Sequence, residues 1–542
     1  MLAASLSATC NRIGPAMILH PTIRHVNPIL RPALAALIAT ILTLTGCQTT
    51  PSATPVAGSI DAREVRGTWI TTTANTAIAT PADTANTMRR LREIGLNTVY
   101  VEVWKNGYTQ FPSAVLKRTV GVDRRPALMP QDPSDKADAL RQPGRDLLQE
   151  MLIEAHRNGL ITVAWFEYGF MAAHKSSNPH LRRMKPEWLS RDMNGNEVAP
   201  NGFVWMNPLH PQARQFLLDL VLEAVDKYDL DGIQLDDRIV WPYVTMGYDD
   251  YTKQAYAAEH NGAAPPADHN DAAWMRWRAE KVNEYAKLFV QEVRAKRPGL
   301  LISLSPAVYP WSWQYYLLEW PKWSAWSAVD RNPNVSASAK LTTPRWDEFI
   351  PQVYRFNYPA FEKTWLEQVE HMRVLGGDRQ RDLLAGIRVV GEGKDATWDE
   401  LRESMLLVRK TGGGGHVHWF SRGVLDVYPN PLTAFYGGHV PSPKFAANWR
   451  RTSIPLFRSA AIASGAAATA WFHPDLARGN YRLIGFDGKS WQYVSDHVID
   501  RSSAGVGRTV FFVDGNYQEV ELIVDRRDDM QREQRDRATS SR

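Results

Sequence analysis

Cysteine is almost absent from this chain of 542 residues, which contains only Cys10 and Cys47. Two cysteines so near the N-terminus exclude a disulfide framework and a cysteine-based zinc site in the remaining chain. The sequence also lacks a His-Glu-x-x-His motif, and His416 with His418 are too few ligands for a catalytic metal. We therefore expect no metal and no other cofactor.

The chain also has no large excess of positive or negative charge and few long hydrophobic runs. The formal net charge is +5, and residues 1–46 contribute three arginines and no acid, which leaves +2 for the rest of the chain. So small a charge gives no electrostatic case for nucleic-acid binding. Hydrophobic residues make up 44% and charged residues 22%, an ordinary globular composition that excludes a multi-span membrane protein.

The N-terminal segment has the pattern of a secretory signal. Residues 33–45 form an apolar run that follows basic residues, ends in small ones and is too short to span a bilayer comfortably. The run closes with Leu44-Thr45-Gly46-Cys47, which resembles the bacterial lipobox and implies lipidation of Cys47. We predict a signal peptide over 1–46 and a flexible tether over 47–61. Because Gln48 resembles the residue found in outer-membrane lipoproteins, we expect an anchor there, with the protein facing the periplasm.

Short apolar strands alternate with amphipathic helical stretches between residues 65 and 420. Eight such units predict a (β/α)8 barrel over 62–440. The alternative is a doubly wound sheet, but no Gly-rich phosphate fingerprint follows the first strand. The segment 311–346, rich in Trp and Pro, is hard to place. The strands are expected at 65–73, 98–104, 161–167, 232–236, 301–305, 349–354, 384–389 and 415–420, and the clearest helices at 83–95, 145–159, 212–228, 272–297, 361–376 and 398–411.

The C-terminal part of the chain has a different texture. Short alternating segments such as 480–485, 490–494 and 518–524 predict a small β-sandwich over 455–525. The last residues, 526–542, are highly charged and are expected to form a frayed tail.

Three long strand-to-helix connections lie on the carboxyl-terminal face of the predicted barrel, where such folds build their active sites. They span 105–144, 168–211 and 237–271, and they are rich in aromatic residues, which disordered segments seldom are. We predict an aromatic-walled groove on which sugar rings can stack. Its aromatic residues are Trp104, Tyr108, Phe111, Phe170, Trp188, Phe203, Trp205, Trp241, Tyr243 and Tyr248.

Strand alternation predicts which side chains point into the barrel. Polar side chains on the inside are costly unless they are used, because a structural barrel fills its layers with Val, Ile and Leu. Glu167 lies at the end of its strand, beside the mouth in either register. The residues predicted to face inward are Tyr100, Glu102, Trp104, Gln234, Asp236, Ser303, Ser305, Gln352, Tyr354, His416 and His418.

Two carboxyl groups that face each other across a barrel mouth are what glycoside cleavage needs. We expect Asp236 to act as nucleophile or base and Glu167 as general acid, with Glu102, one turn deeper, as a third catalytic candidate. The apolar neighbours of Glu167 predict desolvation and a raised pKa; the alternative is an ion pair with Arg388 or another base. Asp237 should point the other way, toward a loop or cap contact. A serine nucleophile is less favoured, since there is no Gly-x-Ser-x-Gly sequence.

Several motifs in consistent order resemble the glycosyl hydrolase-like 10 family. They are Glu64-Val-Arg-Gly-Thr-Trp69, Asn97-Thr-Val-Tyr100, Trp165-Phe-Glu-Tyr-Gly-Phe170, Trp205-Met-Asn-Pro208, Asp231-Gly-Ile-Gln-Leu-Asp-Asp237, Trp274-Met-Arg-Trp-Arg278 and Ser303-Leu-Ser-Pro306. The resemblance implies a (β/α)8 barrel and, for lipoprotein members, hydrolysis of denuded peptidoglycan strands, which lack their peptides. The residues we expect to bind substrate are Trp104, Trp165, Tyr168, Trp205, Asn207, Asp237, Tyr354 and His418.

The segment ending in Asp236 also resembles the fourth-strand motif of family 18 chitinases, with two departures. Gln234 and Arg238 stand where those enzymes have an Asp and the acidic Glu, which argues against substrate-assisted chemistry. An Asp at the end of the fourth strand instead resembles the nucleophile position of alpha-amylase-type barrels. Their acid on the fifth strand is missing, since Ser305 stands there, and Glu167 is the proposed replacement.

The expected protein is therefore a membrane-anchored glycoside hydrolase of cell-wall glycan. Its expected partners are a glycan strand and, through Cys47, a membrane, with no nucleic acid, and we expect a monomer. Two alternatives remain open: a non-catalytic glycan-binding lipoprotein, and a hydrolase of an exopolysaccharide. Retention of several inward carboxylates favours an enzyme, because binding alone can use neutral amides.

Overall fold

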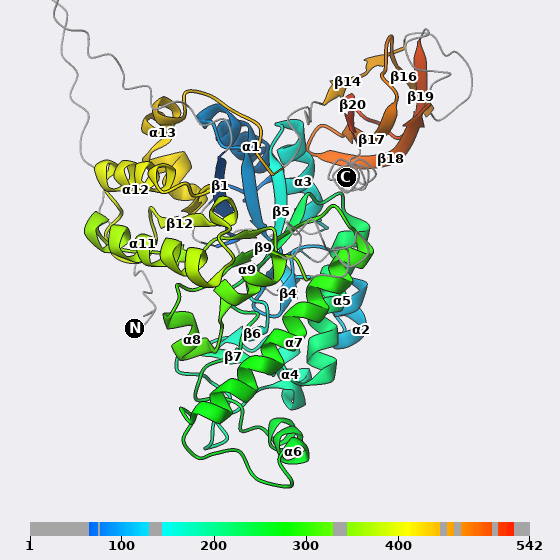
Figure 1. The fold of residues 1–542 in the computed structure, drawn as a ribbon. Helices are drawn as coiled ribbons and strands as arrows, with labels where there is room; N and C mark the ends of the chain where they lie inside the picture. The colour runs from blue at the N-terminus through cyan, green and yellow to red at the C-terminus, as the bar shows by residue number, and fades with distance from the viewer. Residues whose placement is uncertain are drawn as a thin grey trace, which may run out of the picture. The chain divides into compact units, whose positions relative to one another are not determined.

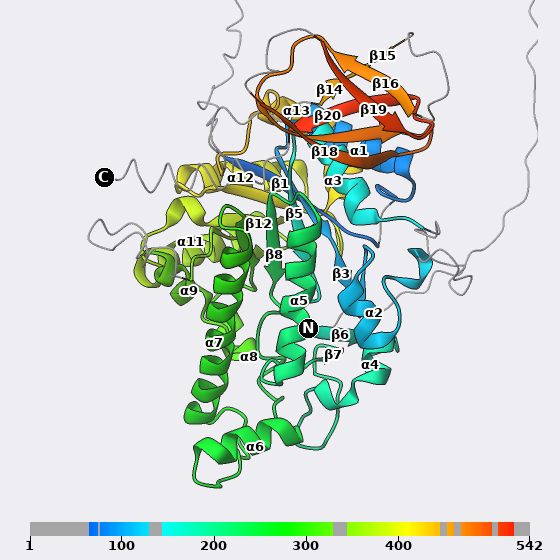
Figure 2. The same cartoon turned by 90° about the vertical axis from the view of Figure 1, so that its right-hand side faces the viewer.

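The computed structural model describes residues 64–73, 76–128, 144–328, 344–444, 453–459, 468–500 and 508–524. The predicted signal peptide, the tether with Cys47 and the tail 526–542 lie outside these ranges. Within them, no helix combines the length and the apolar character that crossing a membrane requires. Figures 1 and 2 show the two kinds of structure that the chain forms, a ring of strands and helices followed by antiparallel sheets.

The barrel is a parallel sheet of eight strand positions. Seven are single strands: β1 (Val65–Ile70), β2 (Thr98–Glu102), β5 (Ile161–Phe166), β8 (Gly232–Asp236), β9 (Leu301–Ser305), β12 (Leu384–Arg388) and β13 (Gly415–Trp419). The sixth is divided into β10 (Glu348–Phe349) and β11 (Gln352–Val353). Pro351 lies in the break, and a proline has no backbone N–H to donate to a neighbouring strand.

The two halves of the divided strand close the ring. Strand β10 pairs with β9, β11 pairs with β12, and Phe349 forms a bridge to Leu383. The predicted (β/α)8 fold is confirmed, and a closed ring excludes the doubly wound sheet.

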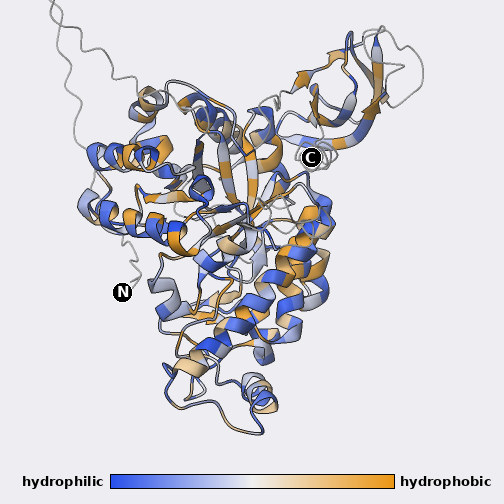
Figure 3. Cartoon of the chain, in the orientation of Figure 1, coloured by the Kyte–Doolittle hydropathy of each residue, from blue (hydrophilic) through white to orange (hydrophobic). Residues whose placement is uncertain are grey.

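Helices follow the strands in the expected order and cover the outside of the sheet. They are α1 (Pro81–Ile94), α3 (Leu147–Arg157), α5 (Pro211–Lys227), α7 (Ala272–Lys296), α11 (Tyr358–Leu375) and α12 (Trp398–Lys410). Local sequence fixes some of their ends: Thr80 with Asp83, and Thr397 with Glu400, form capping boxes at the starts of α1 and α12. The helices show mixed hydrophilic and hydrophobic colouring in Figure 3, because only one face of each packs on the strands.

The segment that was hard to place forms two short helices, α8 (Trp311–Tyr316) and α9 (Trp320–Ala328). Its tryptophans are mainly core residues. Trp320, Trp323 and Trp346 are fully buried, and the rings of Trp323 and Trp346 stack with their centroids 5.4 Å apart. Residues 329–343 lie outside the described ranges.

The long connections on the carboxyl-terminal face contain short elements of their own. The connection after β2 holds β3 (Trp104–Lys105), β4 (Tyr108–Thr109) and α2 (Ala114–Val120). The one after β5 holds β6 (Met171–His174), α4 (His180–Met184) and β7 (Phe203–Trp205), and the one after β8 holds α6 (Asp250–Glu259). Many of their aromatic residues are buried, among them Trp104, Trp205 and Trp241, so these three form loop cores rather than the exposed wall that we predicted.

The C-terminal region forms two antiparallel sheets, in agreement with the predicted β-sandwich. One contains β14 (Ile454–Pro455), β17 (Gly479–Phe486), β18 (Trp491–Ile499) and β20 (Glu519–Val524). The other contains β15 (Phe457–Arg458), β16 (Ala468–His473) and β19 (Thr509–Asp514). Side chains of both sheets share one apolar core, which includes Trp471, Phe511, Leu483 and Leu522.

Candidate active site

Aromatic side chains fill the barrel beneath its carboxyl-terminal mouth. The ring of Trp69, from β1, lies with its centroid 5.8 Å from that of Tyr100, 6.3 Å from Trp165 and 6.0 Å from Trp419. Its indole N–H donates to Oε1 of Gln234 at 2.7 Å, and Nε2 of Gln234 donates to the hydroxyl of Ser303 at 2.9 Å. This packed layer carries the side chains that face the mouth.

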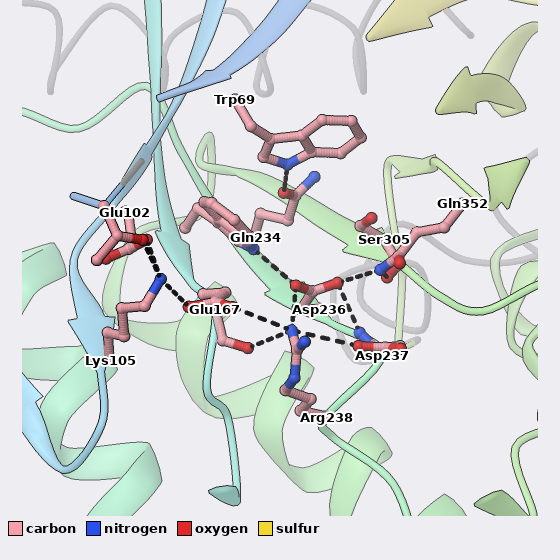
Figure 4. A network of polar contacts seen from close by, with 12 residues as sticks. Trp69, Glu102, Lys105, Glu167, Gln234, Asp236, Asp237, Arg238, Ser305 and Gln352 are labelled. Carbon is pink, nitrogen blue, oxygen red and sulfur yellow. Dashed lines mark hydrogen bonds and ion pairs between the residues drawn. The ribbon is translucent and has the colours of Figure 1, made fainter. Parts of the chain in front are cut away.

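Asp236, at the end of β8, lies directly above that layer and points inward, as the strand alternation predicts. Its Oδ2 accepts hydrogen bonds from the indole of Trp165 at 3.2 Å and from Nη1 of Arg238 at 2.5 Å. Its Oδ1 accepts from Nε2 of Gln352 at 2.5 Å and from the backbone N–H of Asp237 at 2.9 Å. Four donors thus converge on one nearly buried carboxyl group, as Figure 4 shows.

Arg238 connects Asp236 to two further carboxyl groups. Its Nη1 lies 3.3 Å from Oδ1 of Asp237 and 3.7 Å from Oε1 of Glu167, and it donates to the backbone carbonyl of Glu167 at 3.0 Å. The side chain of Asp237 is 18% exposed and therefore faces the solvent more than Asp236 does. The prediction that Asp237 points away from the site is wrong, because Arg238 holds it within the same cluster.

Glu167 lies between two cations. Nζ of Lys105 is 3.1 Å from Oε2 of Glu167, and Arg238 approaches from the other side. The apolar surroundings predicted for Glu167 are therefore wrong. The alternative, an ion pair with a base, is confirmed, but the bases are Lys105 and Arg238 and not Arg388. Arg388 instead donates to the backbone carbonyl groups of Glu392 and Lys394.

Glu102 is completely buried, and its contacts are internal. It accepts hydrogen bonds from the hydroxyl and the backbone N–H of Thr72 and from Nζ of Lys105 at 2.9 Å. Since Lys105 also reaches Glu167, Glu102 positions the cation that borders Glu167. Glu102 therefore lies below the mouth, where it can position Lys105 but cannot contact a substrate.

The electrostatics of the cluster differ between its carboxyl groups and its lysine. Burial raises the pKa of Asp236 and that of Asp237, while Arg238 opposes both rises. Burial disfavours the charge of Lys105, but Glu102 and Glu167 outweigh it and raise the pKa of the ammonium group. Lys105 therefore stays charged, whereas the aspartate pair retains a proton to higher pH than free aspartates do.

His416 and His418 do not face the barrel interior, which corrects the prediction for this strand. Val417 and Trp419 point inward instead: Val417 approaches Gly67, and Trp419 packs on Trp69. The two histidine side chains lie on the outer face of β13, where both contact the hydroxyl of Tyr436 in α13 (Pro429–Tyr436). His418 is thus buried outside the barrel and cannot reach a substrate at the mouth.

The other predicted substrate-binding residues are divided between the cluster and the loops. Trp165 contacts Asp236, and Tyr354 packs on Trp419 with centroids 5.6 Å apart. Asn207 is buried, and its amide donates to Asp249 and Thr252 within the loop. The rest pack within the loops as well: Trp104 donates to the carbonyl of Gly169, Tyr168 packs on Phe203, and Trp205 packs on Tyr316.

Three side chains in the cluster had no role assigned from the sequence: Lys105, Arg238 and Gln352. Lys105 follows Trp104, and Arg238 directly follows the Asp236-Asp237 pair, so a basic residue beside a predicted catalytic acid was the available signal. Gln352 was predicted to face inward, and its amide also donates to the carbonyl of Ser305 at 3.1 Å. Among the described residues, no group of three or more His, Cys, Asp or Glu side chains is arranged to hold a metal ion.

Fold and cluster together define a (β/α)8 barrel with an acidic cluster at the carboxyl ends of its strands, the face on which barrel enzymes carry their chemistry. The sequence profile of the family described as Glycosyl hydrolase-like 10 matches residues 64–374, more than half of the chain. The chain belongs to this family.

Two named relatives and one solved structure place the chain among similar proteins. Over 263 residues it is 26% identical to "Glycosyl hydrolase YngK" of Bacillus subtilis (strain 168), covering 45% of each chain. Over 311 residues it is 24% identical to "Glycosyl hydrolase DigH" of Escherichia coli (strain K12), covering 52% of this chain and 65% of that protein. The match therefore spans less than two thirds of either relative.

The solved structure is the PgaB (BpsB) glycoside hydrolase domain from Bordetella bronchiseptica. It has a TM-score of 0.48 and 12% sequence identity, covering 69% of this chain and 98% of that one. The fold assignment rests on the strand pairing described above.

Proposed function

We propose that this protein hydrolyses glycosidic bonds in cell-wall glycan, with denuded peptidoglycan strands as its substrate. One observation carries the reaction class: the carboxyl groups of Asp236, Asp237 and Glu167 converge on Nη1 of Arg238 at the carboxyl ends of the strands, and burial raises the pKa of the two aspartates. Glycoside hydrolysis by two carboxyl groups needs one that is protonated and one that is ionised. The choice of substrate rests on the family resemblance and on the lipobox-like sequence before Cys47.

Asp236 is the ionised member of the pair in this proposal. Burial raises the pKa of Asp236, but the guanidinium group of Arg238 and the other three hydrogen bonds that the carboxyl group accepts favour its charged form. An ionised Asp236 can stabilise the positive charge that develops on the sugar carbon, attack that carbon, or activate water. Trp165 and Gln352 hold its two oxygens in place while this happens.

The proton donor is one of the two acids that flank Arg238. Glu167 is the donor predicted from the sequence, and Asp237 is the candidate that the structure adds, because it shares a raised pKa with Asp236 and is partly exposed. Lys105 stays charged and keeps Glu167 oriented.

The function is tested by digestion of purified glycans with the wild-type chain. Denuded strands, peptide-bearing peptidoglycan and an exopolysaccharide would each be incubated with the protein, and new reducing ends would be counted. We expect new reducing ends from denuded strands and none from peptide-bearing material. Cleavage of the exopolysaccharide alone would overturn the substrate, and binding without new reducing ends on all three would overturn the enzyme in favour of a glycan-binding protein.

We also propose that a lipid on Cys47 anchors the protein in the outer membrane, facing the periplasm. The support is the apolar run over 33–45 that ends in Leu44-Thr45-Gly46-Cys47. Cys47→Ser should release the protein from the membrane fraction and leave cleavage of soluble glycan unchanged. If the variant stays in the pellet after a salt wash, the lipid anchor is wrong.

A further inference from the structure

Two aromatic rings of α8 are exposed beside the candidate active site. Trp311 is 40% exposed and Tyr315 is 36% exposed. In contrast, Trp320 and Trp323 of the next helix, α9, are fully buried. Their ring centroids lie 4.9 Å apart, with an angle of 35° between the ring planes. Tyr243, from the connection after β8, extends the group, because its centroid is 5.7 Å from that of Tyr315.

Tyr316 joins the exposed rings on the side of the strand ends that carry the acidic cluster. This buried ring lies 5.3 Å from Trp311 and 5.6 Å from Tyr243. Burial raises the pKa of the Tyr316 hydroxyl, and the charge of Asp237 raises it further, so the two side chains are electrostatic neighbours. Asp236 and Ser305 are paired at the ends of β8 and β9, and α8 belongs to the connection that follows Ser305, so the aromatic group lies on the same face of the barrel as the acidic cluster.

Hydrogen bonds hold this aromatic group in place. The backbone N–H of Val244 donates to the carbonyl of Tyr315 at 2.7 Å, which fixes the connection after β8 to the one after β9. The amide of Asn201, from the connection after β5, donates to the hydroxyl of Tyr316 at 3.0 Å. Three connections therefore meet at these rings, and little conformational entropy remains to be lost when a ligand binds.

The chemistry of the group fits a sugar ring better than a protein partner. A sugar presents a face of C–H groups, which an aromatic ring can cover, and an edge of hydroxyl groups, for which tyrosine hydroxyls are partners. A specific protein interface buries roughly 1,200 Å² or more, far beyond two half-exposed rings. Apolar rings exposed beside a polar cluster are also the usual composition of a small-molecule site.

We propose that Trp311, Tyr315 and Tyr243 form a stacking subsite for a sugar ring of a glycan chain whose cleaved bond lies at the acidic cluster. The inference rests on the proposed function and deepens it, because a subsite outside the cluster selects for substrates that extend beyond the cleaved bond. The protein should then discriminate long glycan strands from short oligosaccharides.

The test compares binding of long and short glycans to the full chain carrying Asp236→Asn, which prevents digestion during the measurement. The probes are denuded peptidoglycan strands and the disaccharide derived from them. Trp311→Ala should weaken binding of the long strands about tenfold, a size typical of a lost stacking contact. It should leave binding of the disaccharide unchanged, and Trp311→Tyr should restore most of the affinity for long strands.

The matched control is Trp313→Ala on the same helix. Trp313 lies two residues further along, where the guanidinium of Arg276 covers its ring at 4.5 Å. This control should lose no more affinity for long strands than for the disaccharide. Equal losses for both probes with Trp311→Ala, or the same long-strand loss with Trp313→Ala, would overturn the subsite.

Failure of the subsite and failure of the proposed function give different results. Wild-type protein that binds long strands through Trp311 without producing reducing ends overturns hydrolysis and keeps the subsite. Equal cleavage of long strands by the wild-type protein and by Trp311→Ala overturns the subsite and keeps hydrolysis. Absence of binding to every glycan overturns both.

Discussion

The acidic cluster around Asp236 and the histidine cluster around Tyr436 are both polar, both buried and both built on barrel strands, yet their charges are balanced differently. In the histidine cluster, one carboxylate, Glu64, accepts from Arg66 and Arg409, each at 2.8 Å. The Tyr436 hydroxyl contacts Nε2 of His416 at 2.7 Å and Nε2 of His418 at 2.8 Å.

The acidic cluster has an excess of acids and an opening to solvent. Four carboxyl groups, those of Glu102, Glu167, Asp236 and Asp237, share the two cations Lys105 and Arg238. Arg238 is 20% exposed, so part of the cluster meets water. The comparison shows that polar residues on a barrel strand do not define a site by themselves. A site is defined by unmatched charge that faces the mouth of the barrel.

The largest difference between the clusters should be in turnover. Asp236→Asn removes the ionised carboxylate and should lower kcat for glycan cleavage by about a thousandfold or more, as is usual for a residue of the chemical step. Asparagine is nearly isosteric, so the thermal unfolding midpoint should change little. Initial rates of reducing-end formation give the answer, with Tyr436→Phe as the matched variant in the other cluster. Near-wild-type turnover of folded Asp236→Asn would show that the acidic cluster is not the site.

The second prediction separates the two acids that flank Arg238. The variant that removes the proton donor, Glu167→Gln or Asp237→Asn, should lose about 10²- to 10⁴-fold on natural glycan. The same variant should lose little in the glycosylation step on an activated aryl glycoside, because that leaving group needs no proton. Rates on both substrates identify the donor. If each variant loses equally on the two substrates, neither Glu167 nor Asp237 is the general acid.

A smaller effect is expected on stability from Tyr436→Phe. Losing the hydroxyl leaves His416 and His418 without their shared partner in a buried place, which costs about 1–3 kcal/mol of the free energy of unfolding. Urea unfolding measures this loss, and kcat should remain that of the wild type. A fall in kcat without a fall in stability would mean that the histidine cluster takes part in the reaction.

The last effect concerns the pH dependence of stability, and its sign differs between the clusters. Burial lowers the pKa of His416 and His418. Below about pH 6.5 these histidines therefore bind protons in the unfolded chain but stay neutral in the folded chain. Their contribution to stability is present above that pH and is lost as the pH falls, by up to about 1.4 kcal/mol per pH unit for each histidine. The raised pKa of Asp236 and Asp237 acts in the opposite direction, since that contribution is lost as the pH rises.

His418→Leu tests the histidine part of this dependence. Unfolding free energies measured between about pH 5 and 7 should fall less steeply with acidification in the variant than in the wild type. An identical slope in the two proteins would mean that His418 titrates similarly in the folded and unfolded chain.

The sequence predicted much of the fold because the evidence for each strand is local. Ile233 and Leu235 are apolar and outward, so Gln234 and Asp236 had to be inward, and the hydrogen bonds of both side chains agree. The same rule fails for β13, where it predicts that Val417 points outward. Gly67 and Gly386 leave room inside the barrel for Val417 and for the aromatic layer around Trp69. These glycines belong to other strands, so the sequence of β13 alone does not reveal the space.

The charges around the carboxyl groups could not be predicted in the same way. Lys105 and Arg238 lie just beyond the ends of their strands, where alternation no longer gives direction. Their positions depend on how the long connections fold back over the mouth, as when Phe170 N–H donates to the carbonyl of Arg238. Contacts between distant segments determine the electrostatics of this cluster, and such contacts leave little trace in a single sequence.

The packed interior beneath Asp236 has a consequence for the order of events. Trp69, Tyr100 and Trp165 occupy the barrel below the acidic cluster and are almost inaccessible to solvent. In the part of the chain that the structure describes, these rings fill the barrel below the cluster, so in the proposed reaction water enters through the same opening as the sugar. In the proposed reaction, the part of the glycan that leaves must move out of this opening before water can reach the sugar carbon of the cleaved bond from the same side. If the proposed reaction holds, we expect release of a long product to limit the rate of each cycle and shorter products to leave sooner.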